Sequence, residues 1–261
     1  MATLIKSSTA GLPIVDRREI AAVYVWEWPV RICHWMMVLS LIVLTITGFY
    51  MHRPFLVETS PRAWAMGTAR FIHELFGFIL MAVLILRIYW FFAGNQWARW
   101  RAWLPLTREQ WRNIQSILLY YTYRRREPFP EIGHNSLAAA TYLVIGILLV
   151  LECITGLVLY SVVRGSHLLT SLVGWIPRLV DIQYIRATHY FVMFLFMAFV
   201  VHHVYSAVLV SMESRNGLMD SIFSGWKFVP RSLLEEEAVD ACEGRVRRQR
   251  EGSSKVKESK P

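Results

Sequence analysis

The stretch RATHYFVMFLFMAFVVHHVY, residues 186–205, decides how the rest of the sequence is interpreted. Its aromatic and aliphatic run carries His189 near one end and the adjacent His202 and His203 near the other. Ionisable residues are costly inside an apolar helix, and those that occur there usually serve a function. The stretch therefore predicts a membrane-spanning helix with histidines in functional positions.

Three further apolar runs accompany this one, and hydrophobic residues make up 55% of the 261-residue chain. The four runs cover residues 32–51, 71–92, 137–163 and 190–212. A helix of about 20 residues crosses the roughly 30 Å hydrocarbon core of a bilayer, and a backbone in lipid must satisfy its own hydrogen bonds. We therefore expect an all-α membrane protein, a four-helix bundle formed by residues 26–230.

The net charge of +9 is concentrated in the segments that flank these runs. Lys and Arg gather before the first run, between the second and third runs, and in the C-terminal tail. The positive-inside rule then places both termini and the middle loop in the cytoplasm. We expect the lipid bilayer, and no nucleic acid, to be the partner of this charge.

The segments outside the bundle differ in composition. Residues 1–25 are predicted to be a cytoplasmic N-terminal segment, and residues 231–261 a basic, disordered cytoplasmic tail. Residues 94–131 interleave Trp, Tyr and Arg, which is typical of an amphipathic segment at the membrane interface. The three cysteines form no Cys-x-x-Cys pair, so neither a zinc site nor covalent haem attachment is expected.

Helical periodicity distinguishes His203 from its neighbour His202. A helix turns about 100° and rises about 1.5 Å per residue, so His203 lies within about 40° of the His189 face and about 21 Å further along the axis. His202 is rotated by about 140° from that face. His203 is therefore the predicted partner of His189 in function.

Histidines at the start of the first two predicted helices lie at the same two depths in the membrane as His203 and His189. His34 lies near the predicted inner face together with His203, and His73 lies near the outer face together with His189. Opposed imidazoles from different helices suit axial ligation of haem iron, which favours electron transfer because both axial positions are filled. The pattern predicts two b haems. Bare divalent-metal sites are the alternative, although no Asp or Glu cluster accompanies the histidines.

Other residues near these levels are candidates for contact with the haems. Gly48 and Gly77 lie on the ligand faces, for haem packing or for ordinary packing of small residues between helices. Arg87 faces the inner level, either as the partner of a haem propionate or as a side chain that reaches the headgroups. Further candidate propionate partners flank the histidines: Arg31, Arg70 and Arg186. Glu152 is expected to serve a proton path or to be a hydrogen-bonded carboxylic acid.

RICHWMMVLSLIVLTITG, residues 31–48, strongly resembles the first-helix signature of the cytochrome b subunits of membrane-bound nickel–iron hydrogenases. VYVWEWPVRICHW (23–35), RIYWFFAGN (87–95) and IGHNS (132–136) are similar to that family as well. The resemblance implies that His34, His73, His189 and His203 ligate two b haems. It also implies a subunit that anchors the hydrogenase small and large subunits to the bacterial inner membrane and passes electrons from the small subunit to membrane quinone.

The related cytochrome subunits of membrane formate dehydrogenases bind quinone beside a polar turn before the third helix. By this similarity, His134 and Asn135 are the candidate quinone site, and a helix cap is the alternative role for His134. Hydrogen oxidation would belong to the partner subunits, so this chain would be the quinone-reducing part of a respiratory hydrogen:quinone oxidoreductase. Two other functions stay open: a cytochrome subunit of another dehydrogenase such as formate dehydrogenase, and a haem-free anchor or transporter.

Overall fold

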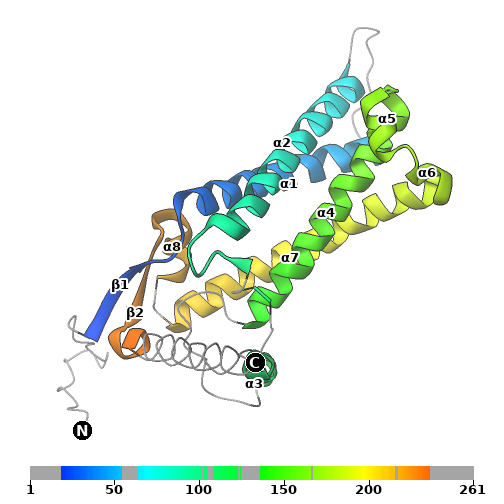
Figure 1. Ribbon diagram of the computed structural model, residues 1–261. Coiled ribbons are helices and arrows are strands. Elements are labelled where there is room, and N and C mark those ends of the chain that lie inside the picture. The colour runs from blue at the N-terminus through cyan, green and yellow to red at the C-terminus, as the bar shows by residue number, and fades with distance from the viewer. Residues whose placement is uncertain are drawn as a thin grey trace, which may run out of the picture.

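In the computed structural model the chain is mostly helical (Figure 1). The structure describes residues 19–54, 64–100, 103–104, 108–122, 124, 136–165, 167–214 and 217–235. Four helices are long and apolar enough to cross a membrane. They are α1 (Trp28–His52), α2 (Ala65–Ala93), α4 (Ser136–Arg164) and α7 (Ile182–Ser214). The expected four-helix membrane fold is confirmed, and each helix extends beyond its predicted apolar run at both ends.

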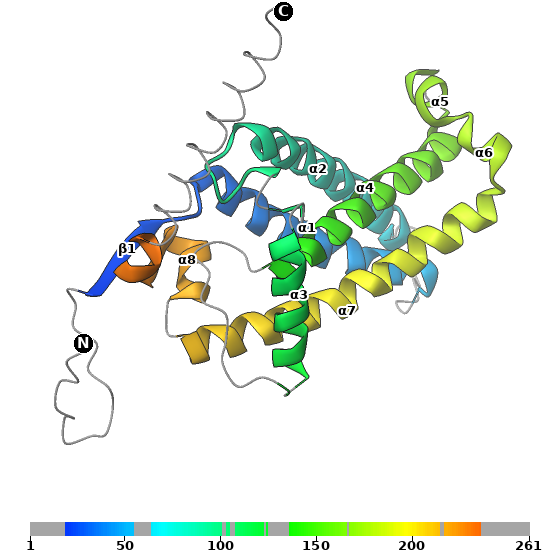
Figure 2. The same cartoon turned by 60° about the horizontal axis from the view of Figure 1, so that its bottom comes forward.

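Shorter elements cover the two ends of the bundle. They are β1 (Ile20–Tyr24), α3 (Arg108–Tyr121), α5 (His167–Val173), α6 (Ile176–Leu179), α8 (Leu218–Ser224) and β2 (Trp226–Pro230). The two strands and α8 lie at one end of the long helices, and α5 and α6 lie at the other (Figure 1). The turned view shows α3 beside the start of α4 (Figure 2). We call the two ends the sheet side and the far side.

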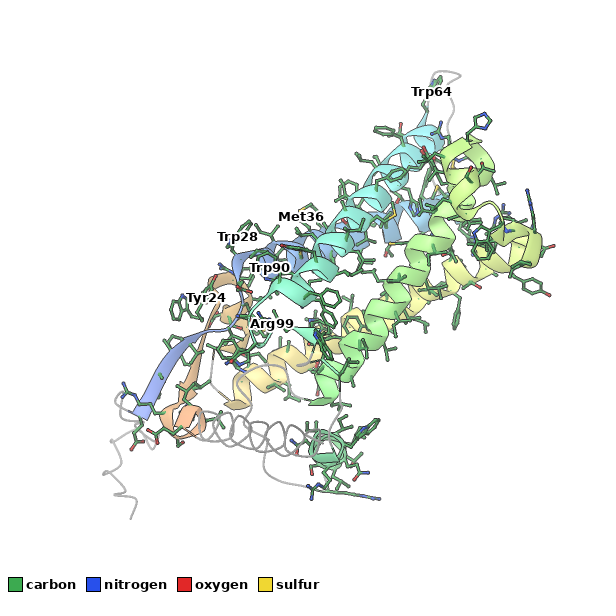
Figure 3. All side chains as sticks on the ribbon, viewed as in Figure 1. Tyr24, Trp28, Met36, Trp64, Trp90 and Arg99 are labelled. Carbon is green, nitrogen blue, oxygen red and sulfur yellow. The ribbon has the colours of Figure 1, made fainter. Side chains whose placement is uncertain are left out.

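The outer surface of the long helices is apolar. Ile46, Ile85 and Val201 are 59%, 66% and 73% exposed, and soluble proteins rarely expose contiguous apolar surface of this extent. Side chains project from the outer faces of the helices along their whole length (Figure 3). Trp28 at the sheet side and Trp64 at the far side are exposed, as expected of indoles at the two interfaces of a bilayer.

A buried apolar cluster occupies the middle of the bundle. All four long helices contribute to it, through Leu80, Leu84, Leu149, Val192 and Phe196 together with Met37, Leu41, Leu44, Ile145, Leu148 and Cys153. Interior packing of this kind excludes water. The cluster therefore separates the polar side chains at the sheet side from those at the far side.

The two-stranded sheet was not anticipated from the sequence, which predicts only a polar segment for residues 20–24. β1 pairs antiparallel with β2, with Ile20 opposite Pro230 and Tyr24 opposite Trp226. Gly225 precedes β2 with φ +87°, and a Cβ there would lie 2.5 Å from the Tyr24 ring. Only glycine suits such a turn. The pairing joins the segment before α1 to the segment after α8.

Glu27 ties this sheet to the end of α2. Its Oε2 accepts hydrogen bonds from the indole nitrogen of Trp90 at 2.8 Å and from the backbone nitrogen of Asn95 at 2.9 Å. The side-chain nitrogen of Asn95 donates to the carbonyl of Val25 at 2.8 Å. The start of α1 is therefore held in a fixed position relative to α2.

The helix α3 lies within the segment predicted for the membrane interface. Ile114 and Ile117 are buried, while Trp111 and Leu118 are exposed, so the helix is amphipathic. Residues 1–18 and 236–261 lie outside the described residues. The expected disorder of the C-terminal tail therefore stays a prediction.

Candidate functional site

Two pairs of histidines face each other at opposite ends of the apolar cluster. His34 of α1 and His203 of α7 form the sheet-side pair, with ring centroids 6.4 Å apart. His73 of α2 and His189 of α7 form the far-side pair, also with ring centroids 6.4 Å apart. Helix α7 contributes to both pairs because residues fourteen positions apart return to nearly the same helix face. The structure thus brings together the same pairs that helix direction and helical phase together predict.

The adjacent histidines of α7 have different surroundings. His203 is half-buried and stacks on Phe199, whereas His202 is exposed. No ring contact joins His202 to the described histidines of either pair. Helical phase therefore identifies correctly which of the two neighbours points into the bundle.

The spacing within each pair fits an iron atom between the two rings. Metal–imidazole nitrogen bonds of about 2 Å on both sides place the centres of two axial rings about 6 Å apart, and both pairs show 6.4 Å. Among the described residues, no three His, Cys, Asp or Glu side chains gather to hold a metal ion. A haem brings its other four iron ligands with it, so these two-histidine sites suit haem better than a bare ion.

Two threonines fix the far-side histidines from neighbouring helices. Thr47 Oγ1 of α1 lies 2.8 Å from Nδ1 of His73, and Thr155 Oγ1 of α4 lies 2.9 Å from Nδ1 of His189. With Nδ1 engaged in this way, the other ring nitrogen of each histidine is the one left for a metal. Hydrogen-bonded partners of this kind orient metal-ligating imidazoles in proteins.

Glu152 and Gly156 of α4 complete the surroundings of His189. Glu152 Oε1 lies 3.3 Å from His189 Nδ1, and its Oε2 is buried with no hydrogen-bond partner in the described part of the chain. A Cβ added at Gly156 would lie 3.2 Å from Cε1 of His189. The ring is therefore in close contact with α4. A proton path through Glu152 stays a prediction.

The sheet-side pair is held less firmly. The Tyr142 hydroxyl lies 3.3 Å from Nδ1 of His203, which is long for a hydrogen bond that involves a hydroxyl. Nδ1 of His34 is buried and has no hydrogen-bond partner within the described ranges. The imidazoles of the two pairs therefore differ in the hydrogen bonds that support them.

Arg87 reaches into the bundle beside the sheet-side pair. Its guanidinium carbon lies 4.8 Å from the centroid of the Trp103 ring, and this ring lies 5.9 Å from that of Tyr142. Nη1 of Arg87 is buried and makes no hydrogen bond to any described residue. A buried cationic donor without a partner is costly, and a carboxylate such as a haem propionate would satisfy it. This placement favours the propionate role over contact with the headgroups.

The other three candidate arginines lie in different surroundings. Arg31 donates to the carbonyl of Phe223, and its Nη2 lies 3.4 Å from the hydroxyl of Tyr24; it thereby joins α1 to α8 and the sheet. Arg70 and Arg186 are exposed at the far side, and Arg186 lies 3.5 Å from Gln183 Oε1. A propionate role for these three arginines stays a prediction.

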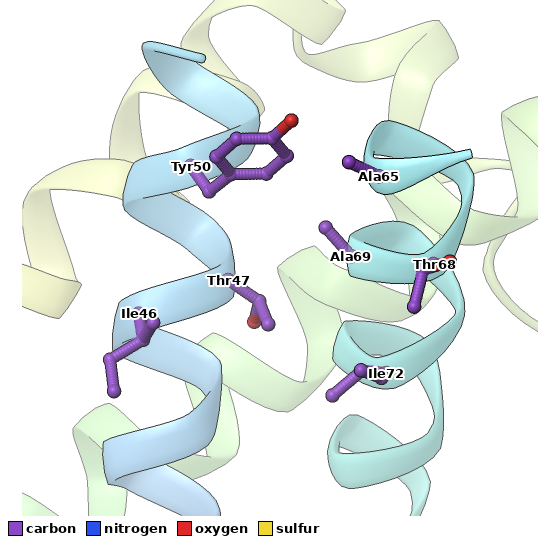
Figure 4. Close-up of a pocket in the computed structure, with 7 residues that line it drawn as sticks. All are labelled: Ile46, Thr47, Tyr50, Ala65, Thr68, Ala69 and Ile72. Carbon is purple, nitrogen blue, oxygen red and sulfur yellow. The ribbon is translucent and has the colours of Figure 1, made fainter. Parts of the chain in front are cut away.

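The two candidate glycines also differ from each other. A Cβ added at Gly48 would lie 3.5 Å from Cε1 of His73, while one at Gly77 would meet no atom of the described residues within 4 Å. Gly48 thus allows the His73 ring to lie against α1. Beside it, an apolar pocket between α1 and α2 is lined by Ile46, Thr47, Tyr50, Ala65, Thr68, Ala69 and Ile72 (Figure 4).

Sequence reasoning missed the residues that support the histidines. Thr47 and Thr155 each stand in the tripeptide Ile-Thr-Gly, and this repeat was the available signal. The contact between Tyr142 and His203 had no such signal. His134 and Asn135 lie outside the described residues, so their candidate role as a quinone site stays a prediction.

Comparisons with known proteins agree with this arrangement. The family described as Prokaryotic cytochrome b561 matches residues 25–225. The chain is 33% identical over 212 residues to a protein of Bradyrhizobium diazoefficiens, covering 78% of this chain and 85% of the relative. It is 35% identical over 213 residues to a protein of Rhizobium leguminosarum bv. viciae, covering 79% and 89%. Both relatives are named "Probable Ni/Fe-hydrogenase B-type cytochrome subunit".

A relative from a third organism gives the same result. The chain is 31% identical over 221 residues to a protein of Escherichia coli strain K12, covering 80% of this chain and 92% of the relative. That protein is named "Probable Ni/Fe-hydrogenase 1 B-type cytochrome subunit". The residues that the family matches, 25–225, span all four long helices and both histidine pairs.

Proposed function

Because this chain belongs to the prokaryotic cytochrome b561 family, we propose that it carries electrons from a nickel–iron hydrogenase to quinone within a membrane. The chain is a multi-pass membrane protein and a b-type cytochrome, so its cofactor is haem b. The names of its relatives support hydrogenase as the partner. The observation that carries the proposal is the presence of two opposed histidine pairs, each with the ring spacing that haem ligation needs.

Each histidine pair holds one haem in this proposal, so the chain binds two. Bound haem would supply a one-electron carrier, and each haem would be held by one histidine from each of two helices. His73 and His189 hold the far-side haem, and His34 and His203 hold the sheet-side haem. The apolar cluster between them keeps water away from the electron path. Arg87 offers a buried positive charge to a propionate at the sheet side.

The positive-inside rule orients the chain in the inner membrane. The sheet side, with residues 19–24, 226–235 and α3 of the arginine-rich middle loop, faces the cytoplasm, and the far side faces the periplasm. The same rule assigns both termini to the cytoplasm. Electrons then enter at the far-side pair from the hydrogenase small subunit, which bears the large subunit beside it. They leave at the sheet-side pair. Asn135, one of the two quinone candidates, immediately precedes α4, which carries Tyr142 to the sheet-side pair.

Purification of the chain with its partners from native membranes tests this function. We expect two b haems per chain, the reduced-minus-oxidised spectrum of bis-histidine haem, co-purification of both hydrogenase subunits, and quinone reduction by hydrogen. A chain without b haem would exclude the cytochrome function. A di-haem chain that co-purifies with formate dehydrogenase would keep the haems and exclude hydrogenase as the partner.

A further inference from the structure

Two copies of the tripeptide Ile-Thr-Gly meet the two far-side histidines. Residues 46–48 of α1 meet His73, and residues 154–156 of α4 meet His189. In each copy the threonine oxygen lies within 3 Å of the histidine Nδ1, at 2.8 and 2.9 Å. In each copy a Cβ on the glycine would contact the histidine Cε1, at 3.5 and 3.2 Å. The two imidazoles are thus held in the same way, by two helices distant in sequence.

The threonine hydroxyls also determine which ring nitrogen carries hydrogen. Thr47 Oγ1 donates to the carbonyl of Val43 at 2.7 Å, and Thr155 Oγ1 donates to the carbonyl of Leu151 at 2.9 Å. A hydroxyl has a single hydrogen and two lone pairs, so toward histidine each threonine oxygen is an acceptor. From these contacts we assign the hydrogen to Nδ1, which then donates it to the threonine oxygen. Nε2 is left bare, which is the form that binds a metal.

Within the described ranges, the sheet-side pair has no equivalent support. Tyr142 approaches His203 only to 3.3 Å, and Nδ1 of His34 has no hydrogen-bond partner among the described residues. At the far side, Glu152 adds a carboxyl oxygen 3.3 Å from Nδ1 of His189. Acceptors at Nδ1 increase the electron density that an imidazole gives to its metal. Such electron-rich ligands stabilise the oxidised iron of a haem and lower its reduction potential.

We propose that the two Ile-Thr-Gly segments make the far-side haem the lower-potential haem of the two, so that electrons pass to the sheet-side haem in the thermodynamically favourable direction. This inference rests on the proposed function because it requires one haem at each histidine pair. Thr47 and Thr155 are positioning residues, since they act through the ligand histidines. Glu152 strengthens the effect at His189.

Redox titration of the intact complex tests this proposal. Valine matches threonine in size and lacks the acceptor oxygen, so Thr47→Val and Thr155→Val should each favour reduction of the lower-potential haem by about tenfold. For a one-electron couple a tenfold change corresponds to about 59 mV. The potential of the other haem should not change, and the haem content should stay at two per chain. Electron paramagnetic resonance should show altered g values for one haem only.

Two variants serve as controls. Thr141→Val removes a threonine of α4 whose hydroxyl donates only to its own helix, to Leu137 at 2.9 Å, and it should leave both potentials unchanged. Thr155→Ser keeps the acceptor oxygen and should behave like the unmodified chain, even if Thr155→Val loses haem. A serine variant that shifts as far as the valine variant would overturn the proposal.

The outcomes separate this proposal from the function on which it rests. Two haems with unmoved potentials in both valine variants would overturn only the role of the threonines. A shift confined to the haem that His34→Ala removes would also overturn it, because the wrong haem would have responded. Absence of b haem from the unmodified complex would instead overturn the proposed function itself.

Discussion

The imidazole of His203 stacks on the ring of Phe199, one turn earlier in α7, with centroids 5.3 Å apart and planes 18° from parallel. His203 also faces His34, whereas its neighbour His202 is exposed. The two adjacent histidines are chemically identical, so only their placement distinguishes their roles.

His203→Ala should therefore remove the sheet-side haem and keep the far-side haem. The complex should still reduce artificial dyes with hydrogen but should fail to reduce quinone, because electrons stop at the far side. Haem content and the two activities, measured on the same preparation, check this. His202→Ala is the matched control and should keep both haems; its loss of a haem would contradict the assignment.

His73→Ala and His189→Ala should both remove the same haem, the far-side one. Each substitution leaves an imidazole that has lost the ring opposite it at 6.4 Å, and a haem with one axial ligand missing is bound less tightly. The reduced-minus-oxidised spectra of the two variants should coincide. If the His73→Ala spectrum instead matched that of His34→Ala, the pairing of helices would be wrong.

Arg87→Leu should lower the occupancy of the sheet-side haem, because it removes the buried cation that we assign to a propionate. Arg87→Lys keeps the charge but not the planar donors of the guanidinium, so it should have an intermediate effect. Haem content by difference spectroscopy measures both variants. Arg164→Leu removes an ion pair with Glu74 and a contact with the Tyr160 ring at the far side, and it should not change the occupancy of the sheet-side haem.

Glu27→Ala should destabilise the sheet side of the protein. It leaves the Trp90 and Asn95 donors without their acceptor, at a cost of about 1–3 kcal/mol of unfolding free energy. Thermal unfolding in detergent, followed by the haem absorbance, measures the change. Glu19→Ala alters an exposed residue at the start of the described chain and should have little effect, while Glu27→Gln retains an acceptor oxygen and should cost less.

Labelling of single cysteines should report the orientation. With the native cysteines replaced, Arg53→Cys and Arg178→Cys at the far side should react with a membrane-impermeant maleimide on spheroplasts. Arg124→Cys at the sheet side should react only after the membrane is opened. All three positions are exposed. The reverse labelling pattern would overturn both the topology and the direction of electron entry.

The long helices and the histidine pairs were predictable because they depend on local properties. Length and apolar composition identify a membrane span, and the regular twist of a helix separates His203 from His202. Alternation of helix direction then pairs His73 with His189. None of these steps requires knowledge of how neighbouring helices are rotated about their axes.

Contacts between helices depend on that rotation and were not predictable. Whether Thr47 faces His73 or lipid is decided by the packing of α1 on α2. A tripeptide that occurs twice, such as Ile-Thr-Gly, does not by itself predict a contact with a histidine. The strands were missed for a related reason. Five residues of mixed character form a strand only because a partner from the other end of the sequence lies beside them.

The pairing of β1 with β2 also determines the order in which the protein can mature. β1 precedes α1 in the sequence and β2 follows α7, so the sheet can close only after the four long helices have been synthesised. His34 and His203 likewise come from the first and last of these helices. If each pair holds a haem as proposed, the sheet-side site is complete only once His203 is in place, and an arrested chain that ends within α7 before His203 should carry haem at the far side alone.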